Sequence, residues 1–472
     1  MPNNDEKKVL LKVTDLKQWF PLKKTKLFQK EQEYVRANDG ITLNIYEGET
    51  VGLVGESGCG KSTFGRTLLQ IYKQTEGKTM YYGRTLTDMA PLYVDETIKN
   101  ISSGKKKIAE LEAKAEALKA EYEKMEDSAE KFQKQAECEN IQKKCNMEFL
   151  NLVQIIGGFY SLDDTKEAEQ LLLEKFKVAR VISGLNEENQ MEGVDKTKEI
   201  AEKKVELEKA EKKLEELRSK YKNDEAFTKY EAYRDNGVDL ARLKTQEMRF
   251  LRKDMQMIFQ DPYSSLNPRM TVGQIIGEGL LAHGIFKKND EKMQAYVMEV
   301  MEKCGLAPYM IHRYPHQFSG GQRQRVGIAR ALIMNPKLII ADECISALDV
   351  SIQAQVVNLM KDIQQETGTA YLFIAHDLSM VKYISDRIGV LHLGHLLETG
   401  TTDEIFNNPI HPYTKSLLSA IPAPNPVVEK NRTALAYDYK TSGIDYKQGT
   451  QHLVDGTHYV KCTDDEFAKW TL

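Results

Sequence analysis

One short stretch constrains the fold of this chain more than any other, because it is a complete G-x-x-x-x-G-K-[ST] motif: Gly55, Glu56, Ser57, Gly58, Cys59, Gly60, Lys61 and Ser62. The apolar run TVGLVG precedes it at residues 50–55, and a helical pattern begins at Thr63. The glycines let backbone N–H groups close around a polyphosphate, Lys61 reaches its outer phosphates, and the Ser62 hydroxyl can ligate Mg²⁺. The motif therefore predicts a strand, a phosphate loop and a helix, in that order.

Further apolar runs predict the rest of a buried sheet. MQMIF at 255–259, KLIIAD at 337–342 and AYLFIAH at 370–376 are short, bounded by turn residues and separated by helical patterns. Runs of this kind are typical of parallel strands that are covered on both faces. The stretch 387–400 instead predicts a two-stranded hairpin that turns at Gly394-His395, and the prolines after residue 422 predict an irregular tail. The predicted fold class is α/β.

The region between residues 88 and 245 interrupts this pattern, and we predict that it is one insertion. Glu, Lys and Ala dominate residues 101–147 and 196–222, with almost no Gly or Pro. Heptad spacing in both stretches predicts a single antiparallel coiled-coil hairpin, whose head is the more apolar stretch 148–190. The spaced residues are Ile108, Leu111, Ala115, Leu118, Tyr122, Met125, Ala129 and Phe132, and then Ile200, Leu207, Ala210, Leu214, Leu217 and Tyr221.

A pair of carboxylates follows the apolar run at 338–342. Asp342 ends the predicted strand, where its carboxylate can hold Mg²⁺, and Glu343 comes next. A carboxylate at the second position can polarise the water that attacks a terminal phosphate. Together with the phosphate loop, the pair predicts a nucleoside-triphosphate hydrolase.

The stretch FSGGQRQR at residues 318–325 runs into a helical pattern. With it the sequence resembles the ATP-binding-cassette (ABC) ATPases, and the resemblance implies that their signature binds the γ-phosphate of ATP held by an opposing subunit. A hydroxyl and open backbone N–H groups at the positive end of a helix suit a phosphate. The implied fold has a parallel-sheet core, an antiparallel β subdomain and a helical signature subdomain. The signature residues are Ser319, Gly320, Gly321 and Gln322.

The same resemblance implies roles for residues elsewhere in the chain. Gln260 matches the Q-loop glutamine, His376 matches the switch histidine that contacts the γ-phosphate, and residues 346–349 match the D-loop with Ser346 and Asp349. For the adenine, the candidate stacking residue is Phe20, just after the first predicted strand. Trp19 is its rival, and half-buried packing is the alternative role. ATP and Mg²⁺ are the implied cofactors. The implied nucleotide-binding residues are Phe20 and the stretch 55–63, which ends at Thr63. The implied Mg²⁺ ligands are Ser62, Gln260 and Asp342.

Three longer stretches narrow the resemblance: residues 259–276, 313–343 and 408–422 look like the F-type ATPase subunit of oligopeptide and dipeptide importers. The resemblance implies a homologous second ATPase subunit in a heterodimer, two membrane permease subunits and an extracellular substrate-binding protein. Related subunits that serve nickel or glutathione leave the cargo open. Two departures stand out. Cys344 occupies a position where the family commonly has Pro, and the usual subunit lacks the insertion.

The predicted domains follow from these motifs. Residues 1–87 hold the start of the ABC ATPase domain, and residues 88–245 hold the insertion. Residues 246–405 hold the remainder of the ATPase domain, and 406–472 form the C-terminal extension of the peptide-importer type. The His-Pro-Tyr-Thr stretch at 411–414 opens that extension.

Composition constrains the location and the partners. The chain has 66 Lys and Arg against 70 Asp and Glu, a net charge of −4, which gives no footprint for nucleic acid. It has no run of apolar residues long enough to span a membrane, its start lacks the apolar core of a signal peptide, and its six cysteines form no C-x-x-C. We expect a cytoplasmic protein, peripheral on the inner face of the cell membrane. A coiled-coil ABC ATPase that acts on DNA is the less favoured alternative, and it predicts stimulation of ATP hydrolysis by nucleic acid.

Overall fold

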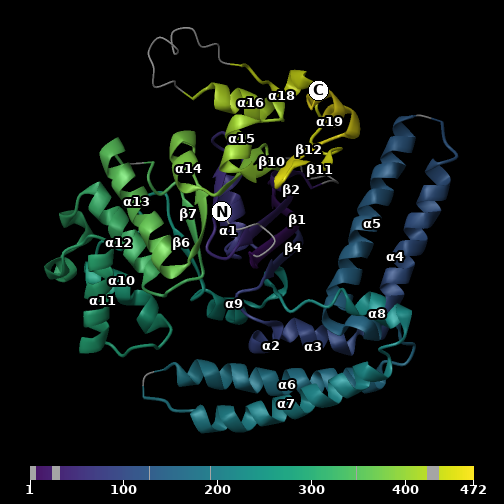
Figure 1. Cartoon of the computed structure of the whole chain (residues 1–472), viewed down its shortest axis with the longest axis horizontal. Coiled ribbons are helices and arrows are strands. Elements are labelled where there is room, and N and C mark those ends of the chain that lie inside the picture. Colours follow the sequence, from purple (N-terminus) through teal and green to yellow (C-terminus); the bar gives the residue numbers. More distant parts are fainter. Residues whose placement is uncertain are drawn as a thin grey trace. The chain divides into compact units, whose positions relative to one another are not determined.

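The computed structural model describes residues 7–23, 32–126, 128–191, 193–346, 348–421 and 435–471. Its contacts divide the chain into two compact units, Met1–Gly83 with Met248–Leu472, and Arg84–Glu247. Each unit is described by itself (Figure 1). The predicted tail after residue 422 and Ala347 of the predicted D-loop lie outside the described residues.

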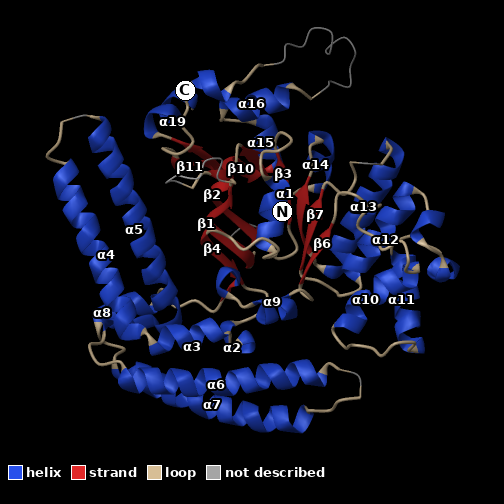
Figure 2. Ribbon diagram, turned by 180° about the vertical axis from the view of Figure 1, so that it is seen from behind, coloured by secondary structure: helices blue, strands red, loops and turns tan. Residues whose placement is uncertain are grey.

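A large mixed sheet forms the centre of the first unit (Figure 2). In the described part of the chain its strand order is β11-β12-β10-β9-β3-β8-β7-β6. The strands that match the predicted runs pair in parallel, and every residue of β3, β7 and β8 is buried, which confirms the prediction of parallel, doubly covered strands. These strands are β3 (Thr50–Val54), β8 (Ala370–Ile374), β7 (Leu338–Asp342) and β6 (Met255–Ile258).

On its other side the sheet continues first in parallel and then in antiparallel pairing. β9 (Arg387–His392) pairs in parallel with β3, and β10 (His395–Thr401) returns antiparallel to β9. The hairpin turns at Leu393-Gly394, where φ is +46° and +82°, so the predicted turn at Gly394-His395 is wrong by one residue. A two-residue turn of this kind requires a positive φ at both central residues, and the glycine fills the second of them. Two further strands complete this edge, β12 (His458–Cys462) and β11 (Thr450–Asp455).

A smaller antiparallel sheet is formed by strands from both sides of the phosphate loop in the sequence. β1 lies between β2 and β4 and pairs antiparallel with both. The first strand continues through Phe20, so the prediction that this residue follows the strand is wrong. The long pairing of β1 with β2 extends the strand as far as Pro21. The bounds are β1 (Val9–Pro21), β2 (Tyr34–Tyr46) and β4 (Glu76–Tyr81).

Helices of the first unit start at defined caps. Thr271 and Ser319 form capping boxes with Gln274 and Gln322, and Asp349 caps the helix that follows it. α10, α11 and α12 lie together in Figure 1. Helix bounds are α1 (Lys61–Leu68), α10 (Val272–Ala282), α11 (Glu291–Lys303), α12 (Gly320–Leu332), α13 (Val350–Thr367), α14 (Leu378–Ile384), α15 (Thr402–Asn407), α16 (Pro412–Ser419), α18 (Tyr439–Ser442) and α19 (Asp464–Trp470). Single turns of 3₁₀ helix lie at η4 (Pro308–His312) and η5 (Pro315–Gln317).

The second unit is helical, and its long helices form two pairs rather than one. α4 (Ile101–Tyr122) packs on α5 (Ala129–Ile156), and α6 (Lys166–Asn189) packs on α7 (Thr197–Lys220). Within the first pair the Cys138 thiol lies 3.2 Å from the Ala115 carbonyl oxygen. The ion pair of Lys175 and Glu211, 3.0 Å apart, joins the second. The prediction of a single hairpin between 101–147 and 196–222 is therefore wrong.

The physical reason is a turn inside the first predicted helix. α4 ends at Tyr122, and Ser128 starts α5 by accepting a hydrogen bond from the Lys131 N–H. Ile108 and Ala115 are buried as predicted, but Phe132 is 60% exposed because it lies beyond the turn. The remaining elements of this unit are α2 (Leu86–Met89), α3 (Leu92–Lys99), η2 (Gly157–Ser161), α8 (Glu225–Glu231), β5 (Val238–Asp239) and η3 (Leu240–Arg242). α9 (Thr245–Leu251) contains the boundary between the units.

No helix in the described ranges combines the length and the apolarity that crossing a membrane requires.

Two buried histidines of the first unit predict how stability depends on pH. Burial lowers the pKa of His411 to about 3 and, as the main cause, that of His395 to about 4, from an ordinary value of 6.5. Between pH 6.5 and about 4 the unfolded chain binds protons at these residues that the folded chain does not, so the free energy of unfolding falls as the pH falls. We expect the thermal unfolding midpoint to drop steadily from pH 7 to pH 4.5. A midpoint that stays constant over this range, or a His395→Gln variant with an unchanged slope, would contradict the assignment.

Candidate nucleotide-binding site

The phosphate loop joins β3 to α1 in a backbone conformation that requires glycine. Gly55 and Gly60 have φ of +150° and +106°. A Cβ would lie 2.0 Å from the Leu391 carbonyl oxygen at the first position and 2.1 Å from the Ala37 carbonyl oxygen at the second. Side chains are therefore excluded at both positions, because the backbone of Leu391 and of Ala37 packs against the loop. Glu56, Ser57 and Gly58 form its exposed rim.

Lys61 is the first residue of α1, two positions earlier than the predicted helix start at Thr63. Its ammonium donates to the carbonyl oxygens of Gly55 and Glu56, both at 2.8 Å. The neighbouring Cys59 is buried, and burial raises the pKa of its thiol. The loop thus holds one buried cation among backbone groups, an arrangement suited to a polyphosphate.

Ser62 and Asp342 converge from α1 and β7. The Ser62 hydroxyl donates to the Asp342 carboxylate at 2.5 Å, and Arg66 lies 3.4 Å from the other carboxylate oxygen. Asp342 is fully buried. A hydroxyl and a carboxylate are hard oxygen ligands of the kind Mg²⁺ prefers, so this donor set fits the ion. The described residues contain no group of three or more His, Cys, Asp or Glu that could hold a metal ion.

Glu343 brings two other predicted residues together. The Gln260 side-chain nitrogen donates to its carboxylate at 2.7 Å, and Nδ1 of His376 lies 4.0 Å from the same oxygen. Glu343 has φ of +45°, uncommon for a residue with a side chain, and its N–H donates to the Ile374 carbonyl oxygen. Strained backbone of this kind clusters at functional sites. The side chain is 16% exposed, and that of His376 is 60% exposed.

The predicted D-loop follows directly. The Ser346 hydroxyl donates to the Glu343 carbonyl oxygen at 2.9 Å, and Asp349 caps α13 by accepting from the Ile352 N–H at 3.0 Å. Cys344, where the family commonly has Pro, is buried, and burial raises the pKa of its thiol to about 12. Cys344 therefore stays a neutral, packed thiol.

The signature residues cap α12. The Ser319 hydroxyl accepts from the Gln322 N–H at 3.3 Å, and the Gln322 side-chain oxygen accepts from the Ser319 N–H at 3.1 Å. Gly320 and Gly321 begin the helix. Figure 1 shows α12 beside α10 and α11 and apart from α1.

The two candidate aromatics differ in what they contact. The Phe20 ring packs edge-on to Tyr72 at 5.3 Å, and the Tyr72 hydroxyl lies 3.5 Å from the Arg66 guanidinium that also contacts Asp342. The Trp19 ring is covered by the Arg36 guanidinium, 4.7 Å from its centroid. Phe20 is thereby linked to the phosphate-loop helix. Adenine stacking on it stays a prediction.

Replacing the aromatics one at a time tests that prediction. If Phe20 stacks on adenine, Phe20→Ala should weaken ATP affinity by about 1–3 kcal/mol, the size of a base–aromatic stack. Trp19→Ala, the matched control, should change it much less. Titration with ATP measures both. The reverse ranking would move the role to Trp19, and equal small effects would favour packing.

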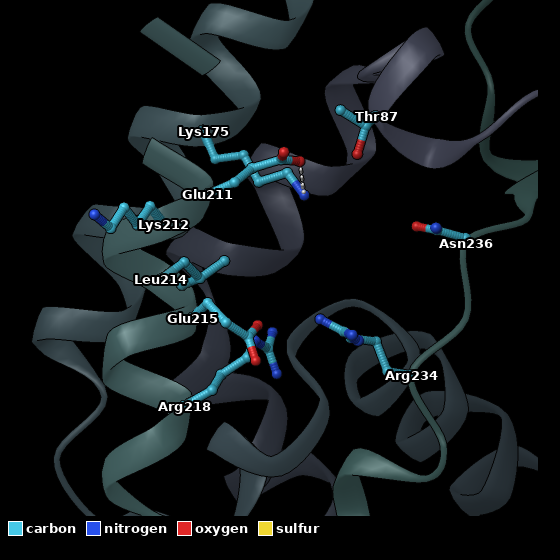
Figure 3. A pocket seen from close by; sticks show the side chains of 9 residues that line it. All are labelled: Thr87, Lys175, Glu211, Lys212, Leu214, Glu215, Arg218, Arg234 and Asn236. Carbon is cyan, nitrogen blue, oxygen red and sulfur yellow. Dashed lines mark ion pairs between the residues drawn. The ribbon is translucent and has the colours of Figure 1, made fainter. Parts of the chain in front are cut away.

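A hollow of about 640 Å³ lies in the second unit (Figure 3). Its charges are largely paired with each other or with nearby carboxylates: Lys175 binds Glu211, and Arg218 and Arg234 both bind Glu231. The Lys175–Glu211 pair links α6 to α7, and the Arg218–Glu231 pair links α7 to α8. The lining residues are Thr87, Lys175, Glu211, Lys212, Leu214, Glu215, Arg218, Arg234 and Asn236.

Sequence reasoning missed several supports of the phosphate loop. The Asn38 side chain donates to the Gly60 carbonyl oxygen at 3.1 Å, and the Gly394 N–H donates to the Cys59 carbonyl oxygen at 2.9 Å. Arg66 and Tyr413 also contact this region. The sequence signals for these two residues were the position of Arg66 on the predicted helix and the His-Pro-Tyr-Thr stretch, which indicated only the family resemblance.

Two family models match parts of this chain. The family model described as ABC transporter matches residues 38–162 and 228–346, and the model described as oligopeptide/dipeptide transporter, C-terminal region, matches residues 397–441. A dimeric ATP-binding cassette bound to ADP and Pi aligns at a TM-score of 0.45 and 17% identity, covering 83% of this chain and 99% of that one.

Curated relatives carry consistent names. The oligopeptide transport ATP-binding protein OppF of Bacillus subtilis is 58% identical over 235 residues, 49% of this chain and 76% of that protein. The protein of the same name in Salmonella typhimurium is 35% identical over 429 residues, 91% of this chain and 82% of that protein. The dipeptide transport ATP-binding protein DppF of Lactococcus lactis is 56% identical over 230 residues, 49% of this chain and 73% of that protein. The chain therefore belongs to the ABC transporter ATP-binding proteins and carries the C-terminal region of their oligopeptide and dipeptide branch.

Proposed function

We propose that this chain is the ATP-binding and ATP-hydrolysing subunit that powers the import of oligopeptides or dipeptides through a separate pair of membrane permeases. The observation that carries the proposal is that Gln260 and His376 both lie close to Glu343, which follows Asp342 of the part-buried Ser62–Asp342 pair. The names of the relatives and the matched C-terminal region support the peptide cargo.

Each residue of the nucleotide-binding site has a separate role in the proposed hydrolysis. The backbone of the phosphate loop and Lys61 bind the phosphates, and we assign Ser62, Asp342 and Gln260 as the residues that would hold Mg²⁺. When bound, this ion neutralises charge on the phosphate oxygens. Glu343 accepts a proton from the attacking water, and His376 contacts the γ-phosphate. The Gln260 hydrogen bond orients the Glu343 carboxylate.

A complete site requires a second subunit. Helix α12, which begins with the signature residues, lies apart from α1 in Figure 1, and backbone N–H groups at the start of α12 suit the γ-phosphate of ATP bound elsewhere. We assign as partners a homologous ATPase subunit, two permease subunits and an extracellular substrate-binding protein. With these partners, the proposed location is cytoplasmic and peripheral, on the inner face of the cell membrane.

The domain assignment and the insertion belong to the same proposal. We assign 1–87 and 246–405 to the ATPase domain, 88–245 to the insertion and 406–472 to the importer extension. The two helix pairs of the insertion are proposed to be antiparallel coiled coils. The buried residues Ile108, Ala115, Ile200 and Leu214 support this, because they recur at heptad spacing.

The test is ATPase activity of the purified chain against its concentration, with and without the partner subunit and permeases. We expect the isolated chain to bind ATP and hydrolyse it slowly, and the complex to hydrolyse it fast. Ser319→Arg should impair the site whose nucleotide lies on the partner. Full turnover that does not depend on concentration would contradict the two-subunit site, and stimulation by DNA would favour a DNA-acting ATPase instead.

A further inference from the structure

The C-terminal extension contacts the phosphate loop through one tyrosine. Tyr413 lies in the first turn of α16, is 2% exposed, and its hydroxyl accepts a hydrogen bond from the Glu56 N–H at 3.1 Å. The peptide unit that carries this N–H also carries the Gly55 carbonyl, which accepts from the Lys61 ammonium at 2.8 Å. Because the N–H and C=O of a trans peptide point in opposite directions, Tyr413 and Lys61 hold one peptide plane from its two sides.

Other residues of the same region fix the position of Tyr413. Its ring stacks on His392 with centroids 4.0 Å apart and an angle of 19° between the planes, and its N–H donates to Nδ1 of His411 at 3.0 Å. Nδ1 of His392 is 2.7 Å from the Tyr446 hydroxyl, which is 2.8 Å from the Tyr437 hydroxyl. A continuous set of contacts thus runs from residues 437–446 to the phosphate loop.

The held peptide lies at the most constrained point of the loop. Gly55 has φ of +150°, and its α-carbon faces the Leu391 carbonyl oxygen so closely that a Cβ would lie 2.0 Å away. A rotation of the Gly55–Glu56 peptide would move the carbonyl that holds Lys61. Loss of the Tyr413 hydroxyl would leave a part-buried N–H without its partner and remove the restraint on that rotation.

We propose that Tyr413 is a positioning residue for the phosphate loop. It orients the Gly55–Glu56 peptide, and through it Lys61, so that the C-terminal extension sets the affinity of the site for nucleotide phosphates. This inference rests on the proposed function, because it takes the loop to be the ATP site. A merely structural tyrosine would affect unfolding alone, whereas a positioning role weakens ATP and ADP and spares adenosine, which has no phosphates.

The experiment compares Tyr413→Phe with Tyr371→Phe in the full chain. Tyr371 is a matched control, since it is buried in β8 and its hydroxyl has no hydrogen-bond partner among the described residues. Isothermal titration with ATP, ADP and adenosine gives the dissociation constants, and thermal unfolding reports folding. We expect the first variant to raise the constants for ATP and ADP about 5- to 20-fold, the range of one lost hydrogen bond, and to leave adenosine within about twofold. The control should match the wild type.

Each outcome separates this inference from the proposed function. Wild-type affinity in a folded Tyr413→Phe chain, or an equal loss for adenosine, overturns the positioning role while ATP binding by the wild type still supports the proposed function. A wild-type chain that binds no ATP overturns the proposed function itself. If Tyr413→Phe does not fold, Tyr446→Phe replaces it, since it removes the hydroxyl that His392 contacts. It should raise the constants for ATP and ADP about two- to fivefold, and no change would overturn the inference.

Discussion

Replacing Glu343 by glutamine is expected to lower ATP turnover by about 10² to 10⁴, the range lost with a general base, while ATP binding stays nearly intact. The amide keeps the shape of the side chain and can still bond Gln260, which is 2.7 Å away in the wild type. It cannot take a proton from the attacking water. The left-handed backbone at this position tolerates glutamine as well as glutamate, because neither is β-branched.

Single-turnover hydrolysis in the assembled complex measures the loss, and ATP titration shows that binding persists. Glu366→Gln is the matched control, since Glu366 is an exposed residue of α13. It should hydrolyse ATP at the wild-type rate. Unchanged single-turnover hydrolysis in Glu343→Gln would show that another group polarises the water.

Lys61→Ala should act on nucleotide binding itself. The ammonium is buried and held at 2.8 Å by two carbonyl oxygens of the loop, a position from which it can bind phosphate oxygens. Charge-assisted hydrogen bonds contribute about 1.5–3 kcal/mol each, so we expect ATP affinity to fall about 10- to 100-fold. Titrations with ATP and ADP measure this, and Lys288→Ala, at an exposed lysine, is the control. Wild-type affinity in Lys61→Ala would place the phosphates elsewhere.

Much of the first unit could be predicted because its signals are local. Apolar runs such as 338–342 appear as strands because burial on both faces demands them, and the motif order placed Gln260, Glu343 and His376 at the ends of neighbouring strands. Their convergence follows from parallel pairing, which brings the carboxyl ends of strands to one edge of the sheet. The left-handed backbone of Glu343 had no such signal, because no glycine or asparagine marks it.

The helical unit, residues 84–247, shows the limit of what heptad spacing can predict. Heptad spacing predicted which face of each helix is buried, and Ile108, Ala115 and Leu214 are buried. Spacing does not say which helix covers that face, and a turn between residues 122 and 129 without glycine or proline redirected the pairing. Tyr413 was missed for a related reason, since its contact with Glu56 joins residues 357 positions apart.

The two ends of the helical unit are tied to each other. The Glu247 carboxylate accepts from the Leu92 N–H at 2.7 Å, and Lys244 pairs with Glu96 at 3.3 Å. A segment whose ends meet costs its host little closure entropy, however many residues lie between them. The segment 84–247 therefore adds little closure entropy to the chain on either side of it, and we expect a fluorescent reporter fused at the 83/248 junction to be accepted for the same reason.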